Sequence, residues 1–437
     1  MTYGIGGLTT NSEAGTVINQ TSIPAYSVKS NAHQLNSYAK IGYLFPDNDF
    51  KSLAIQLSGS YYNYDGAFSS QVYKGEQTSG YFNTIYQNKI NDNQTFKTGI
   101  SGKYDKYNET IDLDTNERQN YLLDEKVIGG YFEHTLNKNR FSLISGLRAD
   151  YNFVYGAFLT PRVHGRYTIS ENTIAKIAIG NGTRTPNVIM ENIGLLASSR
   201  KWIINNSDSG PRYGLQQEKA WNFGLGIHQE FKLNRRKGSI QVDLYRTQFA
   251  NQVVVDLESS AQEVNIYNLD GNSFANSLQT EVNYQLNKRF DIRLAYRYLD
   301  VKTTYESGEQ SLPFVSKNRA FTSLSYKSRE NKKGALWKGE LTAQWIGQQR
   351  ISSTKGNPIQ YQLEDKSPDY YLLSSQITRV FNQHIEVYLG GENLTNYKQK
   401  NPIVQVDNPN GKYFDSSLIW GPIMGANIYF GLRWTIQ

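Results

Sequence analysis

The chain has 437 residues, no cysteine, 38% hydrophobic and 13% aromatic residues, and a formal net charge of +7. The lack of cysteine excludes disulfides, thiol catalysis and thiolate metal sites. A mean hydropathy of −0.59, without any run near the roughly 20 apolar residues of a spanning helix, excludes a helical membrane protein. A polar chain this rich in aromatic residues is typical of strands with one dry and one wet face.

Lysine and arginine are scattered through the predicted strands and turns, and no basic arm or helix stands out. The positive charge therefore does not indicate nucleic acid as a partner. The segment from Met1 to Leu8 has neither a charged n-region nor an apolar h-region, so it does not predict a secretory signal. Two expectations stay open: a cytosolic protein, or the later part of a longer precursor.

Residues 1–30 are rich in Gly, Thr, Ser and Asn without sustained periodicity, which predicts a loop that enters the fold. Residues 31–437 predict one continuous series of strands. The first covers residues 34–45 and stops at the polar turn Pro46-Asp47-Asn48-Asp49, and the second covers residues 51–64.

Two kinds of connection then alternate along the chain. Short polar turns are predicted at residues 91–93, 137–139, 170–172, 234–236, 287–289, 329–333 and 382–383. Longer connections are predicted at residues 65–77, 108–121, 184–214, 251–262, 303–314, 351–367 and 397–419, with one tight exception at Tyr155-Gly156. Short turns at one end and long loops at the other are typical of outer-membrane barrels.

The strands alternate between apolar and polar residues. Phe141, Leu147 and Tyr151 oppose Arg148 and Asp150, and similar patterns occur in residues 278–286, 291–298 and 385–392. A soluble sheet would turn the polar face to open water, but long strands that end in tyrosine favour a lipid band with aromatic girdles around a wet lumen. The predicted fold is an all-β, antiparallel transmembrane β-barrel.

The last stretch shows the pattern without a break. Four side chains share the apolar face of a strand that would close the barrel: Phe430, Leu432, Trp434 and Ile436. The count reaches about seventeen strands, whereas single-chain bacterial barrels have even numbers and leave no edge in lipid. We therefore expect an odd number of strands to precede Met1 in a longer protein.

Several motifs resemble the TonB-dependent outer-membrane receptors of the Bacteroidetes type. The most specific is Gly391-Glu392-Asn393-Leu394-Thr395-Asn396-Tyr397, which resembles the penultimate strand of that family, and the run from Tyr429 to Ile436 resembles its closing strand. The segments 183–200, 218–224 and 243–256 resemble mid-barrel parts of the same receptors.

The resemblance implies a barrel of about 22 strands filled by an amino-terminal plug, of which this chain would hold about the last seventeen strands, without the plug. It also implies four partners: outer-membrane lipid, the TonB complex acting through the plug, the barrel-assembly machinery and a small-molecule ligand. The implied function is uptake of a scarce nutrient, foremost a ferric siderophore or other metal chelate, then cobalamin, with oligosaccharide ranked last.

Candidate ligand contacts lie in the longest mid-chain connection. Arg184, Asn187 and Glu191 occupy the point where a strand leaves the lipid, and Trp202 and Tyr213 could line a vestibule. Asn205 and Tyr361 have the same character. For each residue alone, an ordinary role in ordering the loop is the competing interpretation.

No pattern indicates an enzyme, a cofactor or a metal centre. The histidines are scattered over separate predicted strands without metal-ligand spacing: His33, His134, His164, His228 and His384. Asp112, Asp114 and Glu117 could offer oxygen ligands to calcium, but their loose spacing favours a solvated loop. Two alternative functions stay open: a passive porin or surface adhesion barrel, and a soluble carbohydrate-binding or interaction domain.

Overall fold

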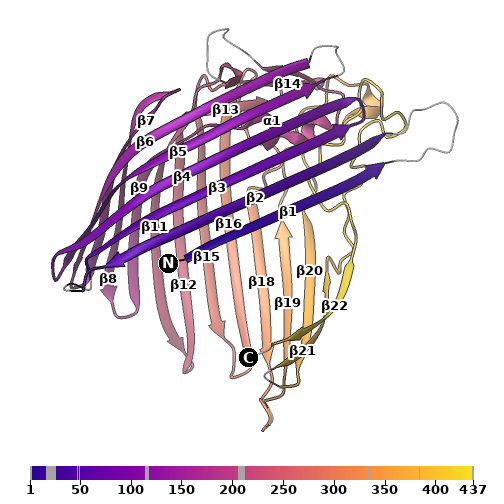
Figure 1. Cartoon of the computed structure of the whole chain (residues 1–437). Helices are drawn as coiled ribbons and strands as arrows, with labels where there is room; N and C mark the ends of the chain where they lie inside the picture. Colours follow the sequence, from indigo (N-terminus) through magenta and orange to yellow (C-terminus); the bar gives the residue numbers. More distant parts are fainter. Residues whose placement is uncertain are drawn as a thin grey trace.

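The computed structural model describes residues 2–15, 26–46, 48, 50–113, 118–204, 212–332, 334–382 and 384–435. Nearly all of the regular structure belongs to one antiparallel sheet of nineteen strands. One of these, the short β17 (Gly308–Ser311), only prolongs a hairpin with β16. The other eighteen pair with their neighbours in chain order and form a strongly curved wall (Figure 1).

The strands of the first half are β1 (Thr2–Gly15), β2 (Ser27–Leu44), β3 (Ser52–Phe68), β4 (Gln71–Asn91), β5 (Gln94–Asp112), β6 (Arg118–Lys138), β7 (Phe141–Asn152), β8 (Gly156–Ser170) and β9 (Thr173–Arg184). The wall continues with β11 (Glu218–Leu233), β12 (Arg236–Asn251), β15 (Ser273–Gln285), β16 (Phe290–Tyr305), β18 (Asn318–Lys327), β19 (Leu336–Ile346), β20 (Tyr370–Val380), β21 (Ile385–Glu392) and β22 (Asn427–Trp434).

The predicted alternation is confirmed in the register of the wall. Leu225, Leu244 and Leu278 face one another across β11, β12 and β15, and Leu225 and Leu244 are 56% and 48% exposed on the outer face. One residue further along, Asp243 lies opposite Gln279, which lies opposite Arg297, on the lumen face. The outer face therefore offers an apolar band to lipid while the lumen stays polar.

In the described part of the chain, the short turns predicted from the sequence join consecutive strands at one end of the wall, and the tight Tyr155-Gly156 connection is also confirmed. Asp47, Asp49, Lys333 and Gln383 of these turns lie outside the described residues. Asn234 and Arg235 form the two-residue turn between β11 and β12 with φ of 49° and 61°. Positive φ at both positions is what a type I′ hairpin turn requires, and asparagine tolerates it better than most residues.

Three predictions about connections were wrong. Residues 1–30 are not one loop, because Thr2–Gly15 forms β1 and pairs along its length with β2; β1 is also the strand missing from the count of seventeen. Residues 65–77 and 108–121 are mostly strand, since Asp65 pairs with Lys74 and Asn108 with Leu122. The strands here reach 21 residues, far longer than an apolar band about 25 Å tall requires. Beyond lipid both faces are wet, so the hydrophobic pattern ends while the ladder continues.

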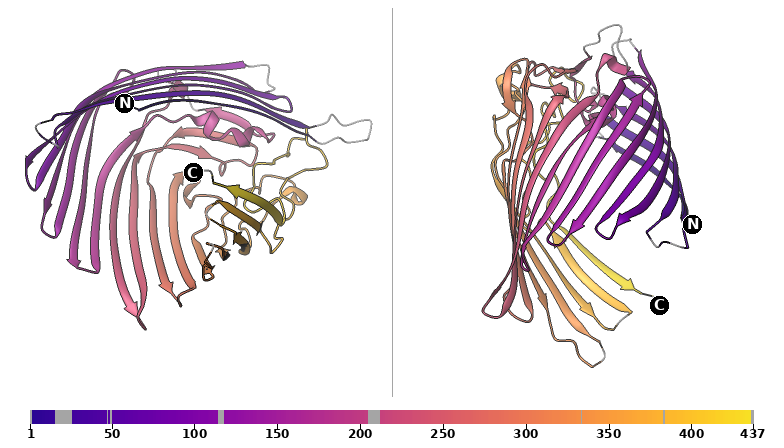
Figure 2. Two further views of the ribbon diagram at one scale, coloured as in Figure 1. Left: turned by 60° about the horizontal axis from the view of Figure 1, so that its bottom comes forward. Right: turned by 90° about the vertical axis from the view of Figure 1, so that its left-hand side faces the viewer.

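The long connections gather at the opposite end. There α1 (Val188–Glu191) and the 3-10 turns η1 (Ile193–Leu196), η2 (Arg212–Gly214) and η3 (Ile359–Tyr361) lie beside a second sheet. That sheet has β14 (Glu263–Asn268) at its centre, parallel to β10 (Lys201–Ile204) and antiparallel to β13 (Val253–Asp256). Figure 2 shows α1 inside the concavity of the wall.

Among the described residues, β1 and β22 each pair with one neighbour only, so the wall has two open edges, which Figure 2 shows apart. Phe430 and Leu432 of β22 lie opposite Leu389 and Val387 and are 72% and 64% exposed on the outer face. Trp434 lies on the same face, and Ile436 falls outside the described residues. In the described parts of the chain, no helix is long and apolar enough to cross a membrane.

Candidate functional site at the long-loop end

The connection between β9 and β11 folds back into the mouth of the wall. Pro186 lies two residues beyond the end of β9, where it cannot donate to a ladder. The apolar side chains that follow pack into a core with residues of β3, β4 and β5. Its most enclosed members are Tyr73, Ile111, Val188, Ile189, Leu196, Leu215, Val264 and Ile266. The core fixes this connection to the inner face of the wall.

Arg184 joins the start of the connection to its end. Its Nε donates to Glu218 Oε2 at 2.7 Å, and its Nη1 donates to Glu191 Oε1 at 2.6 Å. Glu191 also accepts the backbone N–H of Asn187 at 3.1 Å. The two carboxylates raise the pKa of Arg184, although burial alone would lower it. Arg184 therefore connects Glu191 of α1 to Glu218 at the start of β11 through two ion pairs.

A second cluster is buried deeper, where Arg212 and Tyr213 of η2 meet Glu109 of β5. Arg212 Nε donates to Glu109 Oε2 at 3.0 Å, and its Nη2 forms an ion pair with the same oxygen. Tyr213 donates its hydroxyl to Glu109 Oε2, and Tyr73 donates to Glu109 Oε1 at 2.6 Å. Both side chains of the ion pair are at most 2% exposed.

The charge states in this cluster follow from its surroundings. Burial, with the Glu109 charge second, raises the pKa of Tyr213, so the phenol stays neutral and donates. Burial would lower the pKa of Arg212, but its neighbours Tyr213 and Glu109 raise it above the ordinary value. The guanidinium also lies 4.4 Å from the centroid of the Tyr107 ring, as in a cation–π contact. Its Nη1 is buried without a hydrogen-bond partner.

Asn187 links the two clusters. Its Oδ1 accepts from Arg212 Nη2 at 3.1 Å and from the Tyr213 hydroxyl at 3.4 Å. Four of the five candidate residues, Arg184, Asn187, Glu191 and Tyr213, are thus brought together, while Trp202 lies in the apolar core with 5% exposure. The contacts described here are internal, and the role of the five in ligand contact stays a prediction. Asn205 lies outside the described residues.

Sequence reasoning missed the residues that join distant connections. Arg200 Nε donates to Asp415 Oδ2 at 2.8 Å, and both side chains are buried. Arg350 donates from Nη1 and Nη2 to the two oxygens of Glu258 at 2.7 Å and 3.1 Å. No local pattern marks such pairs, because each partner is a single charged residue in a polar stretch.

The lumen below the mouth is lined by alternating charges. Lys97 of β5 and Arg162 of β8 both pair with Glu133 of β6, and Arg148 pairs with Asp150. These residues line a hollow of about 790 Å³ that reaches up to Arg184. Its mixed charges suit a polar solute or a polar protein surface.

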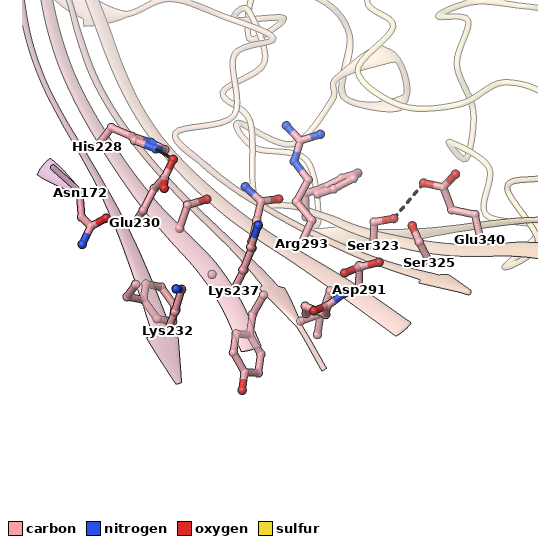
Figure 3. A pocket seen from close by; sticks show the side chains of 18 of the residues that line it. Asn172, His228, Glu230, Lys232, Lys237, Asp291, Arg293, Ser323, Ser325 and Glu340 are labelled. Carbon is pink, nitrogen blue, oxygen red and sulfur yellow. Dashed lines mark hydrogen bonds and ion pairs between the residues drawn. The ribbon is translucent and has the colours of Figure 1, made fainter. Parts of the chain in front are cut away.

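A larger hollow of about 1090 Å³ lies toward the short-turn end of β11–β19 (Figure 3). Lys232 and Lys237 lie opposite each other in register, Arg293 pairs with Glu281 at 2.7 Å, and Ser323 donates to Glu340 at 2.9 Å. Like charges opposite each other on a ladder are unfavourable, so an anionic neighbour would stabilise this part of the wall.

The histidines do not converge on one place: His33 belongs to β2, His134 to β6, His164 to β8 and His228 to β11, and His384 precedes β21. In the part of the chain that the structure describes, no group of three or more His, Asp or Glu side chains could hold a metal ion. Of the calcium candidates, Asp112 ends β5, while Asp114 and Glu117 lie outside the described residues.

Residues 2–394 match the family model described as TonB dependent receptor-like, beta-barrel. No curated protein matches the chain. Among solved structures it resembles the ferripyoverdine receptor of the Pseudomonas aeruginosa outer membrane, with a TM-score of 0.65, 12% identity, and 99% of this chain and 64% of that chain covered.

Two other similar structures are transporters by name. The copper transporter OprC gives a TM-score of 0.64 at 11% identity, with 98% of this chain and 74% of that one covered. The ferric citrate transporter FecA gives 0.63 at 11% identity, with 99% and 70% covered. At these identities the likeness shows the fold alone. The chain spans only 60% to 65% of the length of three of the solved structures that it matches.

Proposed function

The chain belongs to the TonB-dependent receptor-like β-barrel family, and from this premise we propose that it forms the barrel wall of an energy-driven importer of a metal chelate. Its place is the outer membrane, where barrels of this family reside. The long-loop end faces outward in such barrels, so the clusters around Arg184 and Glu109 lie at the mouth through which a solute enters.

The observation that carries the proposal is the family match over 393 consecutive positions, residues 2–394. The choice of cargo rests on the named neighbours, which include receptors or transporters for ferripyoverdine, ferric citrate and copper. A ferric siderophore is the first candidate and cobalamin the second. The lumen supports a polar cargo, because Lys97, Arg148 and Arg162 offer donors in fixed geometry to oxygen-rich ligands.

In the proposed mechanism, the connections at the mouth capture the chelate, and the TonB complex, acting through a plug domain, supplies the energy that opens a path. The wall contributes position and charge rather than chemistry. Arg184, Asn187, Glu191, Trp202 and Tyr213 would shape the capture surface by holding the β9–β11 connection against β5 and β11.

The test is uptake in the host, with the gene deleted and then restored. Cells are given iron-55 as ferric siderophores of several chemical classes or cobalt-57 cobalamin, with and without a protonophore. Uptake that needs both the gene and the proton gradient supports the proposal. Uptake that needs the gene but resists the protonophore assigns a passive porin instead, and a deletion that changes only attachment to surfaces assigns an adhesion barrel.

A matched pair of variants tests the mouth. Arg184→Gln removes the charge that holds Glu191 and Glu218, so we expect weaker binding of the transported chelate to cells. Arg236→Gln, at the short-turn end of β12, removes an equal charge far from the mouth and should leave binding unchanged. If Arg184→Gln and Arg236→Gln bound the chelate equally well, Arg184 would not contribute to the capture surface.

A further inference from the structure

The outer face of the wall carries an apolar groove of about 650 Å³ over β9, β11, β12, β15 and β16. Its side chains share the face opposite to the lumen: Ile177, Ile179, Phe223, Leu225, Leu244, Leu278 and Tyr298 line it. Leu225 and Leu244 are about half exposed. In an outer-membrane barrel this surface meets acyl chains, so the groove is a place where a chain of a bound lipid fits.

A single cation lies at the long-loop end of this groove. Arg246 lies opposite Phe223 and Asn276 in register, one outward position beyond Leu244, and its side chain is exposed. Its Nη1 donates to Asn276 Oδ1 at 3.0 Å and its Nη2 to Gln248 Oε1 at 2.6 Å. The guanidinium also lies 4.7 Å from the centroid of the Phe274 ring.

All of these partners are neutral. Among the described residues no carboxylate forms an ion pair with Arg246. The acid in the same row, Asp300, lies across Asn276 on the next strand and is paired with Lys317 at 2.8 Å. A guanidinium that faces lipid without a counter-ion is unfavourable, whereas guanidinium binds phosphate through two parallel hydrogen bonds. The positive charge of Arg246 is therefore not balanced by an anion among the described residues, and a bound anion would balance it.

The height of Arg246 indicates which leaflet supplies the anion. Trp221 and Phe223 stack on the same face with ring centroids 6.3 Å apart, as in the aromatic girdle that marks a membrane interface. They lie toward the long-loop end of β11, which is the outer side of such barrels. The lipids of the outer leaflet of a bacterial outer membrane are phosphorylated glycolipids.

We propose that Arg246 and the groove beside it form a binding site for a phosphorylated glycolipid of the outer leaflet. The guanidinium binds a headgroup phosphate, Asn276 and Gln248 hold the guanidinium in place, and an acyl chain lies along Leu225, Leu244 and Leu278. The site lies on the outer face of the wall, so this proposal does not depend on which cargo the barrel transports.

The chain offers a matched control. Arg379 of β20 lies on the same outer face at the short-turn end, with Trp337 and Phe381 ring centroids 5.0 Å and 5.7 Å away. It has aromatic neighbours like those of Arg246 and is partly exposed, but it lies outside the groove and toward the other leaflet. Arg379→Gln therefore removes an equal charge from the same membrane-facing surface.

The experiment is native mass spectrometry of the full chain in detergent, titrated with diphosphorylated lipid A. The parent chain and Arg379→Gln should hold one lipid with equal affinity, and Arg246→Gln should bind it about tenfold more weakly because a charged hydrogen-bonded contact is lost. Arg246→Lys, which keeps the charge without the fork, should bind with intermediate affinity. Heat-dependent gel mobility checks that each variant is folded.

Three results would overturn the site. Arg246→Gln could bind lipid A as tightly as the parent chain, dephosphorylated lipid A could bind equally well, or inorganic phosphate alone could saturate the site at the same concentration as the lipid. A second folded variant, Leu244→Gln, places an amide in the groove and keeps Arg246, and unchanged binding by it would remove the groove from the proposal.

Discussion

Arg212 and Glu109 lie 103 residues apart in the chain, yet they form a buried ion pair that holds η2 against the inner face of β5. A buried pair contributes little by its formation alone, since both ions must leave water. Removing one partner is a different matter, because the other charge remains buried without compensation. The pair therefore holds the β9–β11 connection in one position against β5.

Glu109→Gln should release this connection while the wall stays assembled. The uncompensated Arg212 charge would cost about 3–5 kcal/mol, and the lowest-energy response is for the connection to leave its buried site. We expect trypsin to cut within residues 185–217 at a higher rate, measured by gel and mass spectrometry. The control is Glu13→Gln, which breaks an exposed pair with Lys29 and should change nothing. An unaltered cleavage rate in Glu109→Gln would contradict the docking role.

Acid should loosen the small sheet at the mouth through Asp256. Burial opposes ionisation of this carboxylate, but hydrogen bonds from Ser259, Tyr267 and the backbone N–H groups of Glu258 and Ser259 lower its pKa. Because the pKa of Asp256 is lower in the folded than in the unfolded chain, its ionised form stabilises the fold at pH values above the ordinary aspartate pKa of about 3.9. That stabilisation is lost as the pH falls through the folded-state pKa. We expect the β13–β14 hairpin to loosen only at such acid pH.

A spin label measures this transition. Since the chain has no cysteine, Asp270→Cys next to β14 gives a single labelling site. Its spectrum should sharpen at acid pH in the parent background. In an Asp256→Asn background the hairpin should lose that pH dependence, because the titrating group is gone. The same acid transition in both backgrounds would assign the effect to another group.

The regular alternation of apolar and polar residues made the strands of the wall predictable. The connections at the mouth lack this alternation, so the sequence predicts less about them. The period of two is imposed by lipid on one side and water on the other, so strands such as β7 and β16 could be predicted from residues like Leu147 and Leu294. The pattern vanishes where both faces are wet. That is why the ends of β3–β6 at the long-loop side resembled loops. Thr2–Gly15 was missed for another reason, because its glycines and small polar residues leave few apolar side chains to show the alternation.

Contacts at the mouth depend on a different physical cause. Glu109 meets Arg212, and Arg200 meets Asp415, because the curvature of the wall brings separate connections together. Nothing local in the sequence encodes that meeting. Arg184 and Glu191 could be singled out because they lie at the end of a strand and just beyond it, within one short segment where spacing still carries information.

Arg200 and Asp415 should couple the two longest connections. They are 215 positions apart, and the backbone N–H of Ser199 donates to the Phe414 carbonyl at 2.8 Å beside them. In a double-mutant cycle with Arg200→Gln and Asp415→Asn, we expect a coupling free energy of about 1–3 kcal/mol, measured from protease sensitivity of residues 397–419. The exposed pair Lys355–Asp365 is the control and should give almost none. Purely additive effects at Arg200 and Asp415 would show that the connections are independent.

Leu432→Arg should block assembly of the wall. Leu432 lies opposite Val387 on the outer face of β22 and is 64% exposed. A guanidinium near the bilayer midplane costs about 2–4 kcal/mol, and it falls here on an edge strand that pairs with one neighbour. The measurement is heat-modifiable mobility of the membrane fraction on a gel. Gln241→Arg places the same side chain on the lumen face of β12, between Glu281 and His228 in register, and should assemble normally. Normal mobility of Leu432→Arg would mean that this face of β22 does not meet lipid.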